Sequence, residues 1–301
     1  QDPYQQINYR SLTFNNPYWS ARNNEFTEKT NRFFGNAYIE YTPAIQWSED
    51  KKLTFKYQFG TDAYTSHYQD IYEYGTQGLK GNIRNRGVTT TIFNSLFTAN
   101  YEMNLTDRFQ LTAMLGNEVN QENKKFYEEY GQSFNFGGNK NIANTLVQTA
   151  TETKTRYRTV GFFGNLTLSY QNMLFFNVTG RNDIVSSMPR NNRSFFYPSF
   201  SGAFIVTELE PLKGNPALSF LKIRASYAQV GQAGKYYDNY FVKPEYNSGF
   251  WSQPPIIYPI NGVNAYIPYE RRFDPDLKPQ NTRSYELGAD LRLFNNKLGI
   301  D

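Results

Sequence analysis

The sequence has no cysteine, a single histidine and no long run of apolar residues, and each absence excludes a class of protein. Without cysteine there are no disulfides, iron–sulfur clusters, cysteine-ligated zinc sites or thiol nucleophiles. His67 alone cannot build a multi-histidine metal site, and the usual catalytic triads are not available. A membrane-spanning helix needs about 20 consecutive apolar residues, which the chain lacks. We therefore expect no enzyme, no metal site, no cofactor and no helical membrane protein.

Charge adds little, because the formal net charge is only +4 and does not indicate a nucleic-acid partner. Aromatic residues are abundant instead: 25 Tyr and 25 Phe make up most of an aromatic fraction of 18%. Tyr and Phe favour strands over helices. The composition therefore favours an all-β protein.

A strict alternation of apolar and polar residues supports this fold class. In Leu53–Phe59 the odd positions are apolar and the even positions are polar, which is typical of a strand with two different faces. The same alternation recurs in Phe33–Tyr41, Phe93–Met103, Phe109–Leu115, Phe162–Tyr170, Leu174–Arg181, Leu221–Tyr227 and Tyr285–Leu293. Two further strands are expected at Ser199–Val206 and from Leu298 onward, which brings the total to about ten.

The connections between these strands alternate between short and long. Short turns are expected at Thr106–Arg108, Gln171–Met173 and Asn295–Lys297. A soluble β-sandwich also shows alternating strands, but it has no reason to alternate short and long connections. An antiparallel up-and-down barrel in an outer membrane has this asymmetry. The long polar connections are expected at Ser66–Gly87, Glu122–Glu152, Asp183–Phe195 and Gln229–Thr282.

In a transmembrane barrel the two faces of each strand have different environments. The apolar face meets lipid and the polar face meets the lumen. We expect Lys222, Arg224, Glu286 and Asp290 to face the lumen. Tyr41, Tyr101, Phe109 and Tyr170 follow the apolar phase near the short turns, where an aromatic belt is expected.

The expected long loops are rich in aromatic rings, which flexible polar loops normally lack. Two interpretations remain open: the rings pack the loops over the barrel mouth and contact a lid protein, or they bind a ligand directly. The longest loop also contains several prolines, which argue against simple disorder. The candidate contact residues are Tyr68, Tyr72, Tyr237, Tyr240, Trp251 and Tyr258.

Several segments in consistent order resemble the SusC/RagA family of TonB-linked outer-membrane proteins. Gln280 departs from the family, which usually has Glu at that position. The segments that carry the resemblance are Asn16–Trp19, Asn31–Asn36, Arg181–Ser187, Phe196–Ser201, Leu221–Gly231, Asp274–Gln280, Ser284–Asp290 and Leu293–Leu298.

The resemblance implies that residues 1–301 are part of a 22-stranded TonB-dependent receptor barrel with an N-terminal plug. It also implies import of nutrients such as oligosaccharides or peptides across the outer membrane of Bacteroidetes-type bacteria. The implied partners are a SusD-like surface lipoprotein, membrane lipids and the TonB–ExbB–ExbD machinery. We expect the plug and the TonB-contacting segment to lie outside this chain. The residues from Gln1 onward show no leader pattern, so any signal peptide is also expected outside it, and Leu298 is expected to begin a new strand.

Two other functional classes stay open at this stage. One is a structural or secretion-associated outer-membrane barrel component that moves no nutrient. The other is a soluble, aromatic-rich carbohydrate-binding module.

Overall fold

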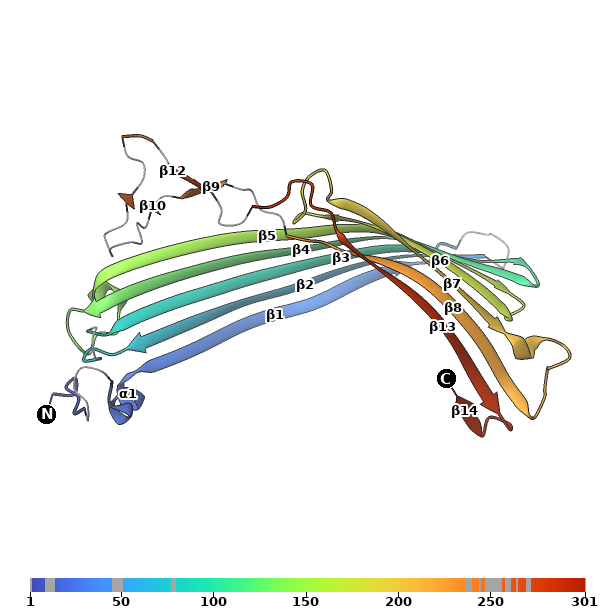
Figure 1. Ribbon diagram of the computed structural model, residues 1–301, viewed down its shortest axis with the longest axis horizontal. Coiled ribbons are helices and arrows are strands. Elements are labelled where there is room, and N and C mark those ends of the chain that lie inside the picture. The colour runs from blue at the N-terminus through green and yellow to red at the C-terminus, as the bar shows by residue number, and fades with distance from the viewer. Residues whose placement is uncertain are drawn as a thin grey trace. The chain divides into compact units, whose positions relative to one another are not determined.

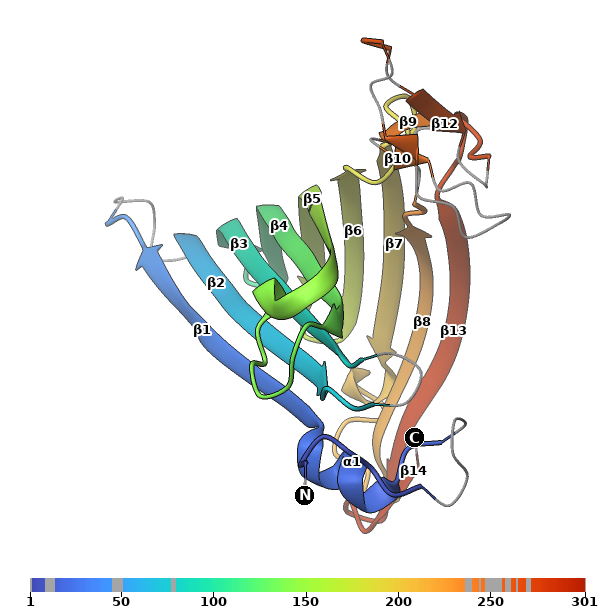
Figure 2. The same cartoon turned by 90° about the vertical axis from the view of Figure 1, so that its left-hand side faces the viewer.

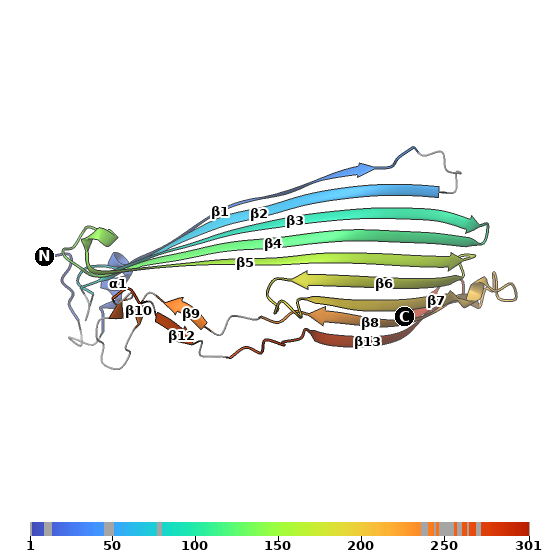
Figure 3. The same ribbon diagram turned by 90° about the horizontal axis from the view of Figure 1, so that it is seen from above.

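The computed structural model places most of the chain in one sheet of ten antiparallel strands (Figure 1). It describes residues 2–8, 14–44, 51–76, 80–235, 240–243, 245–246, 256–257, 261–263, 265–268 and 272–300. Neighbouring strands follow chain order, except that β13 pairs directly with β8. The intervening segment contributes two small sheets, β9–β12 and β10–β11, and Figure 3 shows β9 beside β12. The predicted all-β, up-and-down fold with about ten strands is therefore confirmed.

The strands of the main sheet are β1 (Glu25–Tyr41), β2 (Lys51–Tyr72), β3 (Asn82–Thr106), β4 (Phe109–Phe134), β5 (Thr145–Tyr170), β6 (Leu174–Val185), β7 (Ser194–Ile205), β8 (Leu218–Gln232), β13 (Gln280–Leu293) and β14 (Leu298–Ile300). The small sheets are made of β9 (Tyr240–Lys243), β10 (Glu245–Tyr246), β11 (Ile256–Ile257) and β12 (Ala265–Pro268). The helical segments are α1 (Pro17–Asn23) and the 3₁₀ turns η1 (Ile142–Asn144) and η2 (Val206–Glu208).

Two of the predicted long loops are wrong in extent. The segment 66–87 is mostly strand, since β2 continues to Tyr72 and β3 begins at Asn82. The segment 122–152 is also mostly strand, because only 135–144 separates β4 from β5. Both faces of these strand extensions carry polar residues, so the apolar–polar alternation disappears while backbone pairing continues.

The other two predicted long connections are also shorter than expected, because the strands on either side extend into them. Residues 186–193 join β6 to β7, and the connection after β8 runs over 233–279. This last connection still contains the longest stretch outside the main sheet, and only parts of it lie within the described residues.

The chain divides into two compact units. Unit 1 comprises Gln1–Glu40, Lys56–Phe97 and Glu118–Arg158, and unit 2 comprises Tyr41–Phe55, Thr98–Asn117 and Thr159–Asp301.

Unit 1 has a small core at the ends of its hairpins. Ile71, Ile83 and Phe134 are almost fully buried together, and Tyr74 packs against them. The N-terminal segment joins this end of the unit, since the rings of Tyr4 and Tyr74 lie 5.9 Å apart, edge to face.

Helix α1 precedes β1 in this unit (Figure 2). Its start is fixed by Asn16, whose side chain accepts hydrogen bonds from the backbone N–H groups of Tyr18 and Trp19. Pro17 suits the first helical position because its missing N–H would have no partner there.

In unit 2 the three predicted short turns lie at one end of the strands, as expected. The backbone N–H of Gln171 donates to the carbonyl of Arg108 over 2.7 Å. The backbone N–H of Ile205 donates to the carbonyl of Met173 over 2.8 Å, and the N–H of Phe294 donates to the carbonyl of Ala217 over 3.1 Å. These bonds connect neighbouring turns directly, so the short connections form one continuous rim.

The main sheet buries few of its apolar side chains. Among the described residues, the buried hydrophobic side chains are Ile71, Ile83, Phe134, Val185 and Met188. Large apolar residues on the strands, such as Leu287 (88% exposed) and Tyr285 (75% exposed), are largely uncovered by the rest of the protein. A sheet that leaves so much apolar surface uncovered requires an apolar environment beyond the chain.

Candidate functional site

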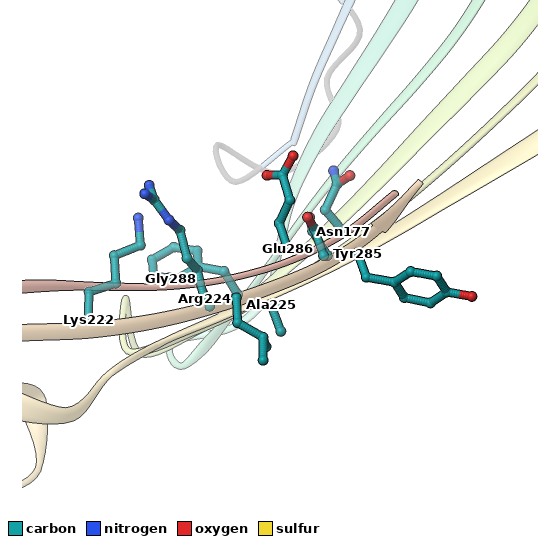
Figure 4. A pocket seen from close by; sticks show the side chains of 13 residues that line it. Asn177, Lys222, Arg224, Ala225, Tyr285, Glu286 and Gly288 are labelled. Atoms are coloured by element: carbon teal, nitrogen blue, oxygen red, sulfur yellow. The ribbon is translucent and has the colours of Figure 1, made fainter. Parts of the chain in front are cut away.

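The charged residues predicted to face the lumen lie together on β8 and β13 of unit 2. In the antiparallel register Lys222 is opposite Asp290, and Ser226 is opposite Glu286. Alternate residues of a strand share a face, so all four predicted residues, with Arg224 between Lys222 and Ser226, lie on the same side of the sheet. Figure 4 shows Lys222, Arg224 and Glu286 on that side, with Tyr285 pointing away from them.

Arg224 lies across the strand pair instead of extending straight out. Its guanidinium is 3.7 Å from the carboxylate of Asp290, which is mostly covered, whereas more than half of the Arg224 side chain is exposed. Residue 288, directly opposite Arg224, is a glycine. A Cβ atom there would lie 2.5 Å from Nε of Arg224, so the glycine provides the space in which the arginine lies.

Lys222, Arg224, Glu286 and Gly288 line a hollow of about 570 Å³ on the polar face. Its floor is made mostly of small side chains, including Ser201, Ala203 and Ser226, and also carries the ring of Phe175. Lys222 and Glu286 mark its two ends, four positions apart along the strands, or roughly 13 Å at 3.3 Å per residue, and Arg224 lies between them. Charges of opposite sign over a floor of small residues suit binding of a polar chain, with no arrangement for covalent chemistry.

The polar face continues across β5 and β6 as a ladder of hydrogen-bonded side chains. The amide of Asn165 donates to the hydroxyl of Thr179 over 2.9 Å, and the amide of Asn177 donates to Thr167 over 2.7 Å. Since Asn177 also lines the hollow, the ladder extends the polar surface beyond the β8–β13 pair.

The opposite face of the same strands is apolar and exposed. The ring of Tyr227 lies between those of Phe200 and Tyr285, with centroid distances of 6.4 Å and 5.0 Å. Phe109 and Tyr170, two of the predicted belt residues, also pack together at 4.6 Å. Other large side chains on this face that are exposed by more than 40% include Leu115, Phe162, Leu166, Leu174, Phe176, Phe196, Ile223 and Leu287.

The aromatic contact candidates have different outcomes. Tyr68 and Tyr72 were expected in a loop but lie on β2. The guanidinium of Arg86 lies 5.5 Å from the ring centroid of Tyr68, and Tyr72 packs edge to face on Phe26 at 5.4 Å.

The other aromatic candidates fall in the connection after β8. Tyr237, Trp251 and Tyr258 lie outside the described residues, and only the backbone of Tyr240, in β9, is described. Their proposed contacts stay predictions.

The sequence analysis missed one inward cluster on the polar face of unit 2. Asp183 accepts hydrogen bonds from the hydroxyl of Tyr197 and from Nε of Arg181, the latter over 2.9 Å. Gly161 is opposite Asp183 in the register, and a Cβ atom there would meet the Arg181 side chain at 2.6 Å. Arg181 and Asp183 are two positions apart and therefore lie on one face of β6. This spacing was the feature of the sequence from which the cluster could have been predicted.

A second missed cluster is an ion pair in the connection between β4 and β5. Lys140 contacts the carboxylate of Glu25 and lies 3.4 Å from that of Glu73, whose side chain is 5% exposed. Burial opposes the charge on Lys140, but hydrogen bonds and attraction from both carboxylates outweigh it and hold the pKa of Lys140 above its usual 10.5.

Two further features concern the described ranges only. No helix within them is long and apolar enough to cross a membrane. Within the same ranges, no three histidine, aspartate or glutamate side chains are grouped in a way that could hold a metal ion.

The comparison with known families agrees with this two-faced sheet. The model of the family described as "TonB dependent receptor-like, beta-barrel" matches residues 1–301. The chain belongs to this family. The fold, with consecutive antiparallel strands, exposed apolar residues on one face and polar residues on the other, is that of its outer-membrane barrels.

Similar proteins include several TonB-dependent receptors of Bacteroidetes. The chain is 24% identical over 276 residues to TonB-dependent receptor P26 of Formosa agariphila, covering 89% of this chain and 27% of that protein. It is 28% identical over 196 residues to TonB-dependent receptor SusC of Bacteroides thetaiotaomicron, covering 62% of this chain and 18% of that protein.

Solved structures of the RagAB peptide importer have a similar fold. In the closed–closed state the TM-score is 0.79 at 19% identity, over 98% of this chain and 31% of that chain. The chain therefore spans less than a third of the length of these relatives, and the match shows a shared fold over that part.

Proposed function

We propose that this chain is part of the wall of an outer-membrane receptor that imports nutrients in a TonB-dependent manner. The single observation that carries the proposal is the division of one sheet into two faces. In unit 2, Leu287 and Tyr285 are exposed on one side, while Arg224 and Asp290 form a charged pair on the other. Membership of the TonB-dependent receptor family, which rests on residues 1–301, supports TonB as the energy source. The wall alone could not indicate it.

The proposed cargo is a nutrient of the oligosaccharide or peptide class. Two observations support this class: one similar structure is named a peptide importer, and the polar face offers charged and hydrogen-bonding groups instead of an apolar pocket. The wall has no catalytic step to perform. Lys222, Arg224, Glu286 and Asp290 line the route or hold the plug inside the complete barrel.

We further propose a SusD-like surface lipoprotein as lid, with TonB, ExbB and ExbD acting through parts outside this chain. The connection 233–279 lies at the end of β8 opposite the short turns and is the candidate lid contact. Its aromatic residues Tyr237, Tyr240, Trp251 and Tyr258 are the proposed anchors, because Tyr and Trp dominate the energetics of protein interfaces.

The test is uptake by cells that produce the full-length receptor with its neighbouring lipoprotein. Labelled oligosaccharides and peptides are offered to cells with and without ExbB and ExbD. Uptake that requires both the receptor and the energising proteins supports the proposal. A barrel that assembles normally, but whose removal changes no nutrient uptake, would instead be a structural or secretion-associated component.

A further inference from the structure

The outer part of unit 1 carries a strip of basic residues on the same face as its exposed apolar residues. The members on β4 and β5 are Lys125, Lys154, Arg156 and Arg158. Their common face follows from side-chain contacts across the strand pair, including Arg156 Nε to Asn123 Oδ1 at 2.9 Å and Arg158 Nε to Gln121 Oε1 at 2.8 Å. We call this set the basic strip.

The basic strip shares its face with β2. The ring nitrogen Nδ1 of His67 on β2 lies 3.0 Å from the hydroxyl of Tyr127 on β4, two residues from Lys125. The intervening strand permits this contact at Gly87, where a Cβ atom would lie 2.1 Å from the Tyr127 ring. The odd positions of β2 and β4 therefore lie on one side of unit 1, together with the strip.

On β2 and β3 the exposed apolar residues of that side give way to polar ones at one level. Phe59 and Phe93 stack across β2 and β3 at 6.2 Å, and both are about 40% exposed. Six residues farther along β2, Thr65 shares a 3.3 Å hydrogen bond with Thr89 instead. On β5 the same face changes from Val160 directly to Arg158, Arg156 and Lys154. The basic strip thus begins where the apolar surface stops.

The charge of the strip is only partly neutralised by the protein. Glu152 lies among these residues, with its carboxylate 2.9 Å from Lys125 and 2.7 Å from Lys154. Arg156 donates to a neutral amide oxygen, which holds the guanidinium in place without cancelling its charge. Lys125 and Lys154 are 48% and 69% exposed, so their ammonium groups remain accessible.

A surface that is apolar below and basic directly above matches the boundary of a membrane leaflet. Acyl chains cover the apolar residues, and the first charged groups beyond them are the phosphates of the headgroups. We propose that the basic strip binds the phosphate groups of anionic lipids in the outer leaflet. This role is separate from import and rests only on the membrane position proposed above.

The test uses the full-length receptor, purified in detergent and titrated with lipid A as the phosphate-bearing probe. The triple variant K125Q/K154Q/R156Q removes three charges from the strip. Because each basic residue near an anionic surface contributes about 1 kcal/mol, or roughly fivefold, we expect lipid A to bind on the order of 100-fold more weakly. Lipid A from which both phosphates have been removed should bind parent and variant equally.

The matched control is K56Q/R84Q/R86Q, which removes the same charge from even positions of β2 and β3, on the other face of unit 1. It should bind lipid A like the parent. Equal losses in both triple variants, or no loss in the strip variant, would overturn the proposal. Loss of lipoprotein co-purification with unchanged lipid A affinity would also overturn it and assign the strip to a protein partner. Heat-modifiable migration confirms that each variant is folded.

Discussion

Gly288 stands directly opposite Arg224, and the absence of its side chain lets the arginine reach toward Asp290 across the strand pair. The hollow on the polar face therefore depends on one glycine as much as on its charged residues. Proteins often place glycine in a strand where another group must approach the backbone closely.

Gly288→Val should impair uptake more than folding. The new side chain displaces Arg224 and fills the hollow, but the arginine is largely exposed and can turn aside. We expect the free energy of unfolding to change by less than about 1 kcal/mol and nutrient uptake to fall several-fold. Uptake at parent level would contradict a role for the hollow. Gly35→Val is the control, since Gly35 does not line the hollow and a Cβ atom there meets nothing within 4 Å.

Leu111→Arg should destabilise the barrel, because Leu111 follows the apolar phase of β4. A charged residue facing lipid near mid-membrane costs about 2–4 kcal/mol. Refolding titrations in lipid vesicles measure the loss, and Thr112→Arg on the neighbouring position of the other face serves as the control. Equal effects of the two substitutions would show that the face assignment is wrong.

Deleting Asn247–Tyr258 should weaken association with the lid lipoprotein while leaving the barrel folded. The segment contains Trp251 and Tyr258, the two proposed anchors. Co-purification of the lipoprotein is the measurement. Replacing the segment with a Gly/Ser segment of equal length distinguishes the effect of losing the rings from the effect of shortening the chain. Normal lid binding in that variant would refute the role of the rings.

Lys140→Met should destabilise the outer end of unit 1. The substitution leaves the nearly buried carboxylate of Glu73 without its cation, and we expect a loss of about 1–3 kcal/mol. Denaturant titration of the full-length receptor measures it. Adding Glu73→Gln should recover part of the loss, whereas additive losses would show that the two residues do not interact.

The same ion pair gives a pH dependence of known sign. Because the folded-state pKa of Lys140 lies above 10.5, its contribution to stability is complete below that value. The contribution is lost as the pH rises through the raised pKa. The stability difference between the parent and Lys140→Met should therefore be constant near neutral pH and shrink at strongly alkaline pH. A difference that grows with pH would contradict the assignment.

The strands of the membrane part could be predicted from the sequence because one of their faces carries apolar side chains and the other carries polar side chains. Alternation alone placed Lys222, Arg224, Glu286 and Asp290 on one side of β8 and β13, and the register is consistent with a shared face. That this face meets the lumen stays a prediction. Which of them meet could not be predicted, since the pairing of β8 with β13 is set across the connection 233–279. The proximity of Arg224 to Asp290 emerges only from that register.

The outer strand extensions were missed for a physical reason. Beyond the apolar band both faces of a strand are polar, so period-2 hydrophobicity carries no signal even though backbone hydrogen bonds continue. Tyr68 was therefore interpreted as a loop residue, whereas it lies within β2 against Arg86. Propensity for strands among Tyr and Thr residues in 61–72 was the remaining clue.

The length of β4 and β5 has a practical consequence. Lipid covers only about 9–11 residues of a transmembrane strand, whereas each of these strands has 26, which leaves roughly 50 Å of paired strand outside the bilayer. The hairpin tip at 135–144 follows the last residue of this extension in β4 and precedes the first in β5. Since this chain has no native cysteine, one cysteine introduced at Asn139 would give this part of the wall a single attachment point for a dye or an antibody tag.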